Sequence, residues 1–363
     1  MMNAAFRRLL TLHLGVRRGE RVLILADRGV SGPTDTTRLA AGIAGAGRGL
    51  ARISFATFPE TGRNGVEPPE TAWRPAFGGA AVHELKTLRI LTPLLEKRAT
   101  AGQQAAAVRI IRAHRNEAPH AALFITNWSA THTKFRWLLS KAAGAAVASC
   151  PGIRASMFRT AFAIDAMAMA RRTRRVANLL DAADAVRIAS PDGTSLSFSI
   201  RNRKAHPDDA LIKRGSFGNL PGGEAFVAPV EGTANGTLAV RAAPAGKLPS
   251  VMTFRIAHGR AILVAGGGKT SKVLTGLFRT HPEFSVVAEF GVGTNPGATL
   301  RTNILESEKI LGTIHIAFGD NATFGGTNRA AFHQDFLVFR PTVDLILRSG
   351  RPTRLLEKGR LRA

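Results

Sequence analysis

Two histidines and an aspartate late in the sequence have the residue types and the spacing of a metal-binding half-site. His315 lies in the segment Gly312-Thr-Ile-His-Ile-Ala-Phe318, where strand alternation places it on the opposite face from its isoleucine neighbours. His333 and Asp335 are two residues apart, so on a strand both face the same side. Imidazole and carboxylate groups are common protein ligands of zinc and related metals, and this segment therefore predicts a metal site.

Two glutamates stand in apolar surroundings earlier in the chain. Glu224 follows a Gly-Gly pair and enters the apolar segment 225–228, and Glu289 lies within the apolar segment 286–291. A carboxylate in such a strand is costly to bury unless it is paired with a cation or ligates a metal. Spacing alone leaves both explanations open, because the 39 arginines of this chain could supply the pairing.

The elements that must position these residues differ between the two halves of the chain. Residues 1–184 alternate apolar strands with helices, which predicts an α/β domain with a parallel, helix-covered sheet. A long amphipathic helix over 156–183 is expected to close this half, and the basic segment 84–114 is expected to be an inserted helical pair. The expected strands are 21–26, 51–55, 121–126 and 145–149, with helices at 35–46 and 133–142.

Residues 185–363 predict a mainly antiparallel α+β domain that carries the metal site. Pro191-Asp192-Gly193 joins the strand segments 185–190 and 194–200 as a hairpin, and His258-Gly259 joins 253–257 and 260–265 in the same way. Further strands are expected at 225–228, 237–240, 313–318 and 336–339. The composition change near residue 185 marks the expected boundary between the two domains.

Other motifs give no support for alternative chemistry. The segment 266–270, Gly-Gly-Gly-Lys-Thr, lacks the glycine that a phosphate-binding loop needs five positions before its Gly-Lys pair, so we interpret it as a turn and helix start. The segment 291–297 has a proline where a dinucleotide-binding helix would begin. Cys150 is expected to be a small core residue, and the absence of a Gly-x-Ser-x-Gly elbow argues against a serine hydrolase.

The chain is strongly basic, with 50 Lys and Arg against 25 Asp and Glu and a formal net charge of +25. Residues 1–185 hold 27 basic and 12 acidic residues and the remainder 23 and 13, so the excess is spread along the chain. Nucleic-acid-binding proteins usually concentrate charge and interleave aromatic residues, so we expect no nucleic-acid partner.

A membrane segment is not expected either, because no apolar stretch approaches the roughly 20 residues that span a bilayer. The single cysteine excludes a disulfide scaffold, and residues 1–14 lack the pattern of a secretory signal. We therefore expect a cytoplasmic protein.

The ordered set Glu224, Glu289, His315 and His333-x-Asp335 resembles that of the thermophilic-type metalloaminopeptidases, the family of aminopeptidase T and aminopeptidase S. The resemblance covers nearly the whole chain and includes many ordered blocks. These are Gly19-Glu-Arg-Val-Leu-Ile24, Gly65-Val-Glu-Pro-Pro69, Ser129-Ala-Thr-His-Thr133, Pro151-Gly-Ile153, Gly218-Asn-Leu-Pro-Gly-Gly-Glu224, Ala228-Pro-Val-Glu-Gly-Thr-Ala-Asn-Gly236, Glu289-Phe-Gly-Val-Gly-Thr-Asn-Pro296, Asn303-Ile-Leu-Glu306, Glu308-Lys309 and Gly312-Thr-Ile-His-Ile-Ala-Phe-Gly-Asp-Asn321.

The resemblance implies an α/β domain followed by a domain with two divalent metal ions, zinc, cobalt or manganese, and a homodimer. It implies that the protein releases N-terminal amino acids from peptide substrates. The implied ligands are Glu224, Glu289, His315, His333 and Asp335, and Glu289 or Glu224 would also shuttle the proton to the leaving amine.

One departure from the family concerns transition-state stabilisation. Family members carry a tyrosine seven residues after the equivalent of His315, where this chain has Ala322, and the chain contains no tyrosine at all. Asn321 is a possible replacement donor. Two alternatives follow from this departure and from a second resemblance. The dihydroxypyridine dioxygenases are similar in the second half and use one ferrous iron at His/His-x-Asp, without glutamates matching Glu224 and Glu289. The other alternative is a non-catalytic binding protein on this scaffold.

Overall fold

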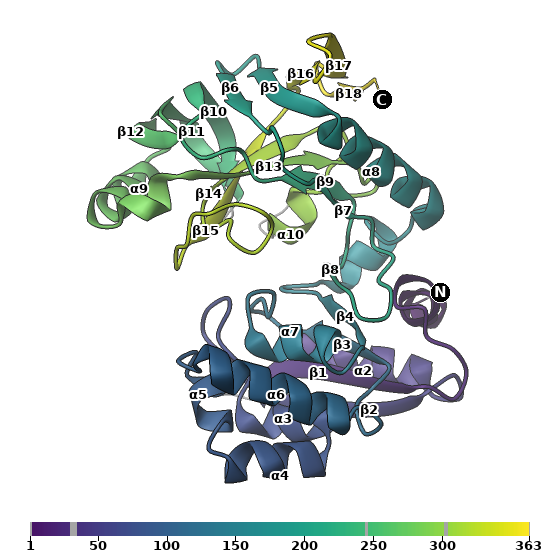
Figure 1. Ribbon diagram of the computed structural model, residues 1–363. Helices are drawn as coiled ribbons and strands as arrows, with labels where there is room; N and C mark the ends of the chain where they lie inside the picture. Colours follow the sequence, from purple (N-terminus) through teal and green to yellow (C-terminus); the bar gives the residue numbers. More distant parts are fainter. Residues whose placement is uncertain (1, 30–34, 244–245, 301–303, 363) are drawn as a thin grey trace. The chain divides into compact units, whose positions relative to one another are not determined.

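The computed structural model describes residues 2–29, 35–243, 246–300 and 304–362. The chain forms two compact units, Met1–Ala163 with Ala210–Pro221 and Ile164–Asp209 with Gly222–Ala363 (Figure 1). The composition change suggested one boundary at residue 185, whereas these units interleave, because residues 210–221 return to the first unit and add a strand to its sheet. No helix within the described ranges is both long enough and apolar enough to cross a membrane.

The first unit is built on a five-stranded sheet with the order β2-β1-β3-β4-β8. All four strand pairs are parallel, as the alternation of strands and helices predicted. The strands are β1 (Arg21–Arg28), β2 (Arg52–Pro59), β3 (Ala121–Ile125), β4 (Ala146–Ser149) and β8 (Phe217–Asn219).

Helices supply the apolar side chains that cover this sheet. Leu23 and Leu25 of β1 pack with Phe124 of β3 and with Trp73 and Phe135 from the covering helices. The helices are α1 (Met2–Arg8), the π-helix η1 (Leu9–His13), α2 (Asp35–Gly47), α3 (Glu70–Phe77), α4 (Gly79–Thr87), α5 (Leu91–Leu95), α6 (Ala101–Ala113), α7 (Lys134–Lys141) and the 3₁₀ helix η2 (Ala155–Arg159).

Two helical expectations differ from the structure. The segment 84–114 contributes to three helices, α4 to α6, whose Leu85, Leu94 and Ile111 belong to the core described above. The long helix expected over 156–183 is divided into η2 and α8 (Ala166–Asp181). Asp165 ends the interruption, because its side chain accepts a hydrogen bond of 3.0 Å from the backbone N–H of Ala168 and caps α8.

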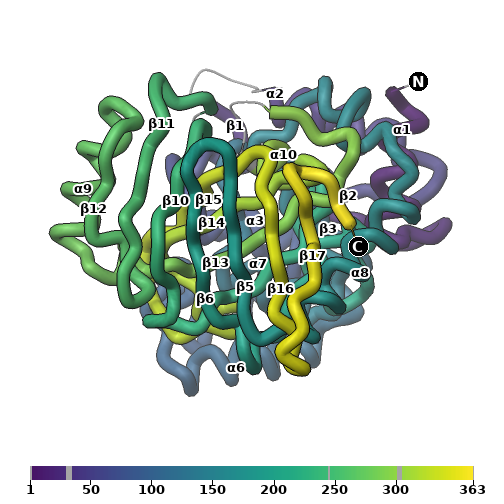
Figure 2. Tube along the Cα trace, turned by 90° about the horizontal axis from the view of Figure 1, so that it is seen from above, coloured from purple at the N-terminus to yellow at the C-terminus, as the bar shows by residue number. Residues whose placement is uncertain are grey.

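The second unit contains a 13-stranded sheet (Figure 2). Eleven of its strands follow the order β18-β17-β16-β5-β6-β10-β15-β14-β13-β9-β7, and the other two are β11, which pairs with β10, and β12, which pairs with β11. Both expected hairpins are present, as β5 with β6 and β11 with β12. The strands are β5 (Ala183–Ala189), β6 (Ser195–Ser199), β7 (His206–Asp208), β9 (Glu224–Val227), β10 (Asn235–Ala243), β11 (Gly246–Ala257), β12 (Arg260–Gly266), β13 (Val287–Gly293), β14 (Ile314–Gly319), β15 (His333–Val338), β16 (Thr342–Leu347), β17 (Pro352–Glu357) and β18 (Arg360–Leu361).

An apolar core lies against this antiparallel sheet. Phe254, Phe318 and Phe336 from three strands pack at ring-centroid distances of 4.8–5.8 Å. Helix α8 adds Val176 to the same core, and α9 (Lys269–Thr280) adds Phe278. The short helices η3 (Pro282–Ser285) and α10 (Ile304–Ser307) complete the unit. This core holds rigid the strands from which the candidate metal ligands project.

Candidate metal centre

The five residues singled out by the sequence lie on four strands that are neighbours in the second sheet, β9, β13, β14 and β15. Glu224 begins β9, Glu289 lies in β13, His315 in β14, and both His333 and Asp335 in β15. The register places His315 beside Gly291 and Asp335 beside Ala317, so side chains from all four strands converge. The sheet thus brings together every site residue that the sequence predicted.

The cluster consists of two groups of potential ligands that share Glu289. Glu224, Glu289 and His315 form one group, and Glu289, His333 and Asp335 form the other. The Nε2 atom of His315 lies 3.3 Å from Glu224 Oε2 and 3.3 Å from Glu289 Oε1. The Nε2 atom of His333 lies 3.3 Å from Glu289 Oε2 and 3.7 Å from Asp335 Oδ1. Each oxygen of Glu289 therefore faces a different imidazole.

A glycine opposite His315 makes room for its ring. Gly291 is the cross-strand partner of His315, and a Cβ atom at Gly291 would lie 2.0 Å from both Cε1 and Nε2 of that ring. Such a distance is far below any tolerated contact, so the imidazole lies where a side chain would otherwise be. Gly291, the first residue of the segment 291–297, thus leaves the space that the ring of His315 occupies. The segment forms no nucleotide-binding helix in the structure.

Hydrogen bonding directs the Nε2 atom of His333 toward the carboxylates. Its Nδ1 atom lies 2.8 Å from the carbonyl oxygen of Asp320, an arrangement in which Nδ1–H donates and Nε2 is left as a ligand. The Nδ1 atom of His315 is buried and has no hydrogen-bond partner among the described residues. Both imidazoles thus present Nε2 to the shared carboxylate of Glu289.

The electrostatics of the cluster show an excess of negative charge. Burial opposes the ionisation of Glu289, but hydrogen bonds from His315 and His333 hold its pKa well below the usual range. Burial opposes the protonation of His315, whereas its hydrogen bond to Glu289 and the charge of Glu224 raise its pKa to about 9. For His333, bonds to Asp335 and Glu289 outweigh burial, and its pKa lies well above the ordinary value. These carboxylates strongly stabilise positively charged neighbours, and for the same reason they are suited to bind metal cations.

The interatomic distances also fit metal coordination. Two ligand atoms that each lie about 2.1 Å from a tetrahedral ion are roughly 3.4 Å apart, close to the 3.3 Å separations within this cluster. Glu224 Oε2 is buried and has no hydrogen-bond partner in the described chain, so it is available as a ligand. Neither glutamate is paired with an arginine in the ion pairs described, but one oxygen of Glu224 is paired with a cation, the ammonium group of Lys309. The residues present therefore fit a site for divalent cations.

Sequence reasoning missed a second layer of charged residues beneath Glu224. The ammonium group of Lys309 contacts Glu224 Oε1 directly, and lies 2.7 Å from Glu308 Oε1 and 3.6 Å from Asp208 Oδ2. Burial raises the pKa of Asp208 to about 7 and that of Glu308 to about 8. The resemblance included the Glu308-Lys309 pair, but a Glu-Lys dipeptide carries no signal of burial, and Asp208 carried none either.

Asn321, the residue considered as a replacement for the family tyrosine, lies in the loop between β14 and β15. Asn321 Nδ2 donates to Glu231 Oε1 over 3.0 Å, and its Oδ1 accepts from the backbone N–H of Asn328 over 2.9 Å. The side chain is fully buried, and these bonds tie it to Glu231, between β9 and β10, and to Asn328 of its own loop. Ala322, the next residue, is partly exposed.

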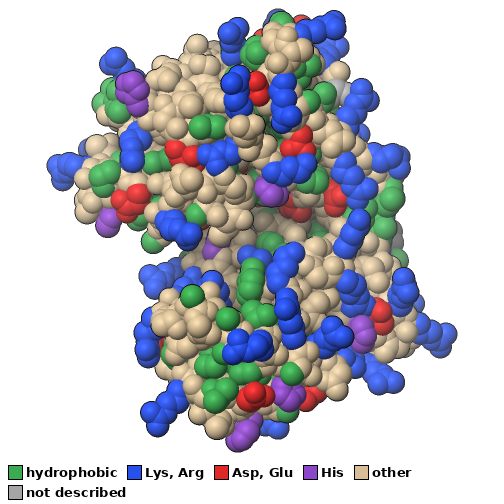
Figure 3. Space-filling view, viewed as in Figure 1, with side chains coloured by type: hydrophobic (Ala, Val, Ile, Leu, Met, Phe, Trp, Pro, Cys, Tyr) green, Lys and Arg blue, Asp and Glu red, His purple; other side chains and the backbone are tan. Residues whose placement is uncertain are grey.

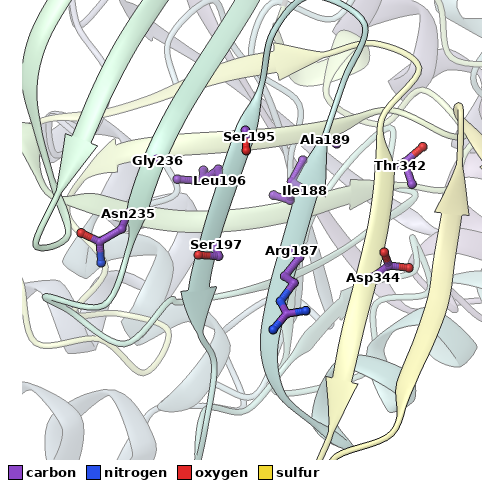
Figure 4. A pocket seen from close by; sticks show the side chains of 10 residues that line it. All are labelled: Arg187, Ile188, Ala189, Ser195, Leu196, Ser197, Asn235, Gly236, Thr342 and Asp344. Atoms are coloured by element: carbon purple, nitrogen blue, oxygen red, sulfur yellow. The ribbon is translucent and has the colours of Figure 1, made fainter.

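Other candidate features lie outside the cluster. The segment 266–270 ends β12 and begins α9, as a turn and helix start should, and Cys150 is fully buried. A shallow hollow of about 530 Å³ on the second sheet is lined by residues of β5, β6, β10 and β16, among them Arg187 and Asp344 (Figure 4). None of the five predicted ligands lines it. Lys and Arg side chains are scattered over the face shown in Figure 3.

Comparisons with solved structures support the fold over the full length. The chain is similar to 2,5-dihydroxypyridine dioxygenase from Pseudomonas putida, with a TM-score of 0.72, 16% identity, and coverage of 100% of this chain and 97% of that chain. It is also similar to wild-type AmpT from Thermus thermophilus, with a TM-score of 0.63, 18% identity, and coverage of 100% and 99%. At sequence identities this low, the two matches establish a similar fold and not a similar function.

Sequence comparison identifies the family. No curated protein matches the sequence significantly. The model of the thermophilic metalloproteases (M29) matches residues 87–361, which is well over half of the chain and includes all five clustered residues. The chain belongs to the thermophilic metalloprotease family, M29.

Proposed function

We propose that the protein is a metal-dependent aminopeptidase that releases N-terminal amino acids from peptides at a site of two divalent cations, zinc, cobalt or manganese. The position of Glu289 carries this proposal. Its two oxygens face His315 on one side and His333 on the other, each at 3.3 Å, so Glu289 would be able to hold an ion on either side. Glu224 and Asp335 complete the two ligand groups.

Two divalent cations bound there would activate a water molecule as the nucleophile and polarise the scissile carbonyl at neutral pH. The residues of the chain supply the positioning and the proton transfer. Glu224, Glu289, His315, His333 and Asp335 would hold the ions. Glu289 or Glu224 would carry the proton of the attacking water to the leaving amine through a carboxylate oxygen that is then released from its ion. The rigid strands of the second sheet keep these groups at fixed separations.

Hydrolysis of leucine p-nitroanilide tests the proposal. Activity should appear when the metal-free protein receives Co²⁺ or Zn²⁺, and EDTA should abolish it. Inactivity across a broad panel of peptides, in a protein shown to hold two metal ions, would contradict the aminopeptidase and favour a binding protein on this scaffold.

A single-iron, ring-opening dioxygenase is the second candidate function. The alanine at position 322, where the aminopeptidases have a tyrosine, favours it, and the fold of 2,5-dihydroxypyridine dioxygenase is similar over the whole chain. A two-histidine, one-carboxylate set is enough for ferrous iron and oxygen chemistry. A single iron would not need Glu224 and Glu289 as further ligands, so the presence of both glutamates supports the two-metal hydrolase. Metal analysis separates the two functions, because one iron per chain with oxygen uptake on a dihydroxypyridine would replace our proposal.

We also propose that the protein acts on peptides as a homodimer, as its resemblance to the metalloaminopeptidases implies. Light scattering coupled to size-exclusion chromatography measures the mass directly. A chain of 38.6 kDa should elute as a species of twice that mass, and a monomeric mass at micromolar concentration would contradict this part of the proposal.

A further inference from the structure

A fully buried lysine lies next to one of the two ligand groups, in contact with Glu224. The side chain of Lys309 is 0% exposed, and its ammonium group lies among the carboxylates of Asp208, Glu224 and Glu308. A buried ammonium is costly unless it is paired, and here three carboxylates pair with it. The contact with Glu224 links this lysine to the candidate metal ligands.

The backbone fixes both partners of that contact. The N–H of Lys309 donates to the carbonyl of Glu306 over 3.1 Å, and its own carbonyl accepts from the N–H of Asn295 over 2.9 Å. On the other side, Glu224 is paired in register with Asp208 across β9 and β7. The ammonium therefore meets Glu224 from a fixed position.

The contact distinguishes the two oxygens of Glu224. Oε1 is taken by Lys309, while Oε2 points to His315, with 3.3 Å between Oε2 and Nε2. We propose that Lys309 is a positioning residue, an inference that rests on the proposed metal function. It holds one oxygen of Glu224 so that the other is presented, as a single ligand atom, to the ion shared with His315 and Glu289. Groups of this kind, which orient a ligand without touching the metal, typically change metal affinity by about 10–100-fold.

The sign of the effect separates positioning from simple electrostatics. Removing a positive charge beside a cation site strengthens cation binding if charge alone matters. If Lys309 acts by orienting Glu224, its removal weakens binding although the site becomes more negative. The Glu289, His333 and Asp335 group has no contact with Lys309 among the ion pairs described, so its affinity should remain unchanged.

Titration of the metal-free protein with Co²⁺, followed by calorimetry and by the cobalt absorption spectrum, tests the proposal. The wild type should bind two equivalents. In Lys309→Met one binding step should weaken by about 10–100-fold, with a changed cobalt spectrum, while the other step stays the same. Unchanged or tighter binding of both equivalents would overturn the positioning role.

Three further variants keep the result interpretable. Lys204→Met removes an exposed lysine of the same unit that pairs with Asp181, and it should bind both ions normally. The double variant Asp208→Asn, Glu308→Gln keeps Lys309 and Glu224 and removes two neighbouring negative charges, so it measures the effect of charge alone. Because Lys309→Met leaves carboxylates unpaired and so endangers folding, the triple variant adds Lys309→Met to these two substitutions. Relative to the double variant, loss of the lysine should weaken the same binding step by about 10–100-fold.

The proposed function and the positioning role fail in different ways. A wild type that binds no Co²⁺ overturns the metal site and the role of Lys309 with it. A wild type that binds two ions, together with a folded triple variant that binds both ions as tightly as the double variant, overturns only the role of Lys309.

Discussion

Glu289 is the residue on which the candidate metal centre depends most. It belongs to both ligand groups, it is buried, and hydrogen bonds from two histidines stabilise its ionised form. Loss of its charge removes a ligand from each group at once. No other residue of the cluster is shared in this way.

We predict that Glu289→Gln lowers the affinity for Co²⁺ by at least about 100-fold, the upper end of the loss caused by removing a supporting partner. The amide keeps the size of the side chain but removes its charge and one acceptor oxygen. Calorimetric titration measures the loss, and Glu283→Gln, at a partly exposed glutamate of the same unit, is the matched control. Two tightly bound ions in Glu289→Gln would show that Glu289 is no bridging ligand.

Ala322 offers a gain-of-function test of the proposed chemistry. A hydroxyl donor to the developing oxyanion is worth about 10²–10³ in rate, and the family tyrosine that would provide it is missing here. We predict that Ala322→Tyr raises kcat on leucine p-nitroanilide by up to that factor with little change in KM. Ala322→Phe adds the ring without the hydroxyl, so equal rates for the two variants would contradict this prediction.

At the scale of the elements, the pairing of β13 with β14 decides where His315 lies. The strands are in register so that the imidazole crosses over Gly291, and no other residue type leaves that space. A site that relies on one missing Cβ atom is sensitive to the smallest substitution.

We predict that Gly291→Ala displaces the ring of His315 and weakens one of the two Co²⁺ binding steps by roughly 10-fold or more, by analogy with other losses of ligand orientation. Gly276→Ala is the control, because a Cβ at this position of α9 meets nothing within 4 Å. Calorimetry and thermal unfolding of both variants check binding and stability separately. Normal metal binding in Gly291→Ala would mean that the ring has room to move aside.

Local signals predicted the elements better than the way in which they combine. The hairpins β5–β6 and β11–β12 follow from turn residues that act over a few positions, and α2 and α7 follow from their apolar periodicity. The division between η2 and α8 was not predicted, because it depends on one capping aspartate within a continuous amphipathic pattern. The return of residues 210–221 to the first sheet depends on pairing with β4, which no local pattern reveals.

At the scale of the whole molecule, the positive charge is a surface property that is separate from the cluster. Basic side chains are scattered over the visible face rather than gathered in one patch, in agreement with their spread along the sequence (Figure 3). A net charge of +25 nevertheless attracts anions over distances set by ionic strength.

We predict that kcat/KM is higher for acidic peptides than for neutral ones at low salt and that salt removes the difference. The Debye length falls from about 10 Å at 0.1 M to about 3 Å at 1 M salt, which screens such attraction. Rates for an acidic and a neutral peptide of equal length, measured over this range, provide the test. Turnover insensitive to both salt and peptide charge would leave the surface charge without a role in substrate capture.

The sequence by itself identified the candidate metal ligands and predicted that they lie on strands. Types and spacing were enough for His315, His333 and Asp335, because strand alternation is a local rule. Only the tertiary structure decided that Glu289 faces both histidines, that Gly291 admits a ring, and that Lys309 holds Glu224 across 85 positions of sequence. The physical reason is that a buried charge must be compensated by the groups packed beside it. Those groups come from distant parts of the sequence, and the pairing of the strands decides which of them become neighbours.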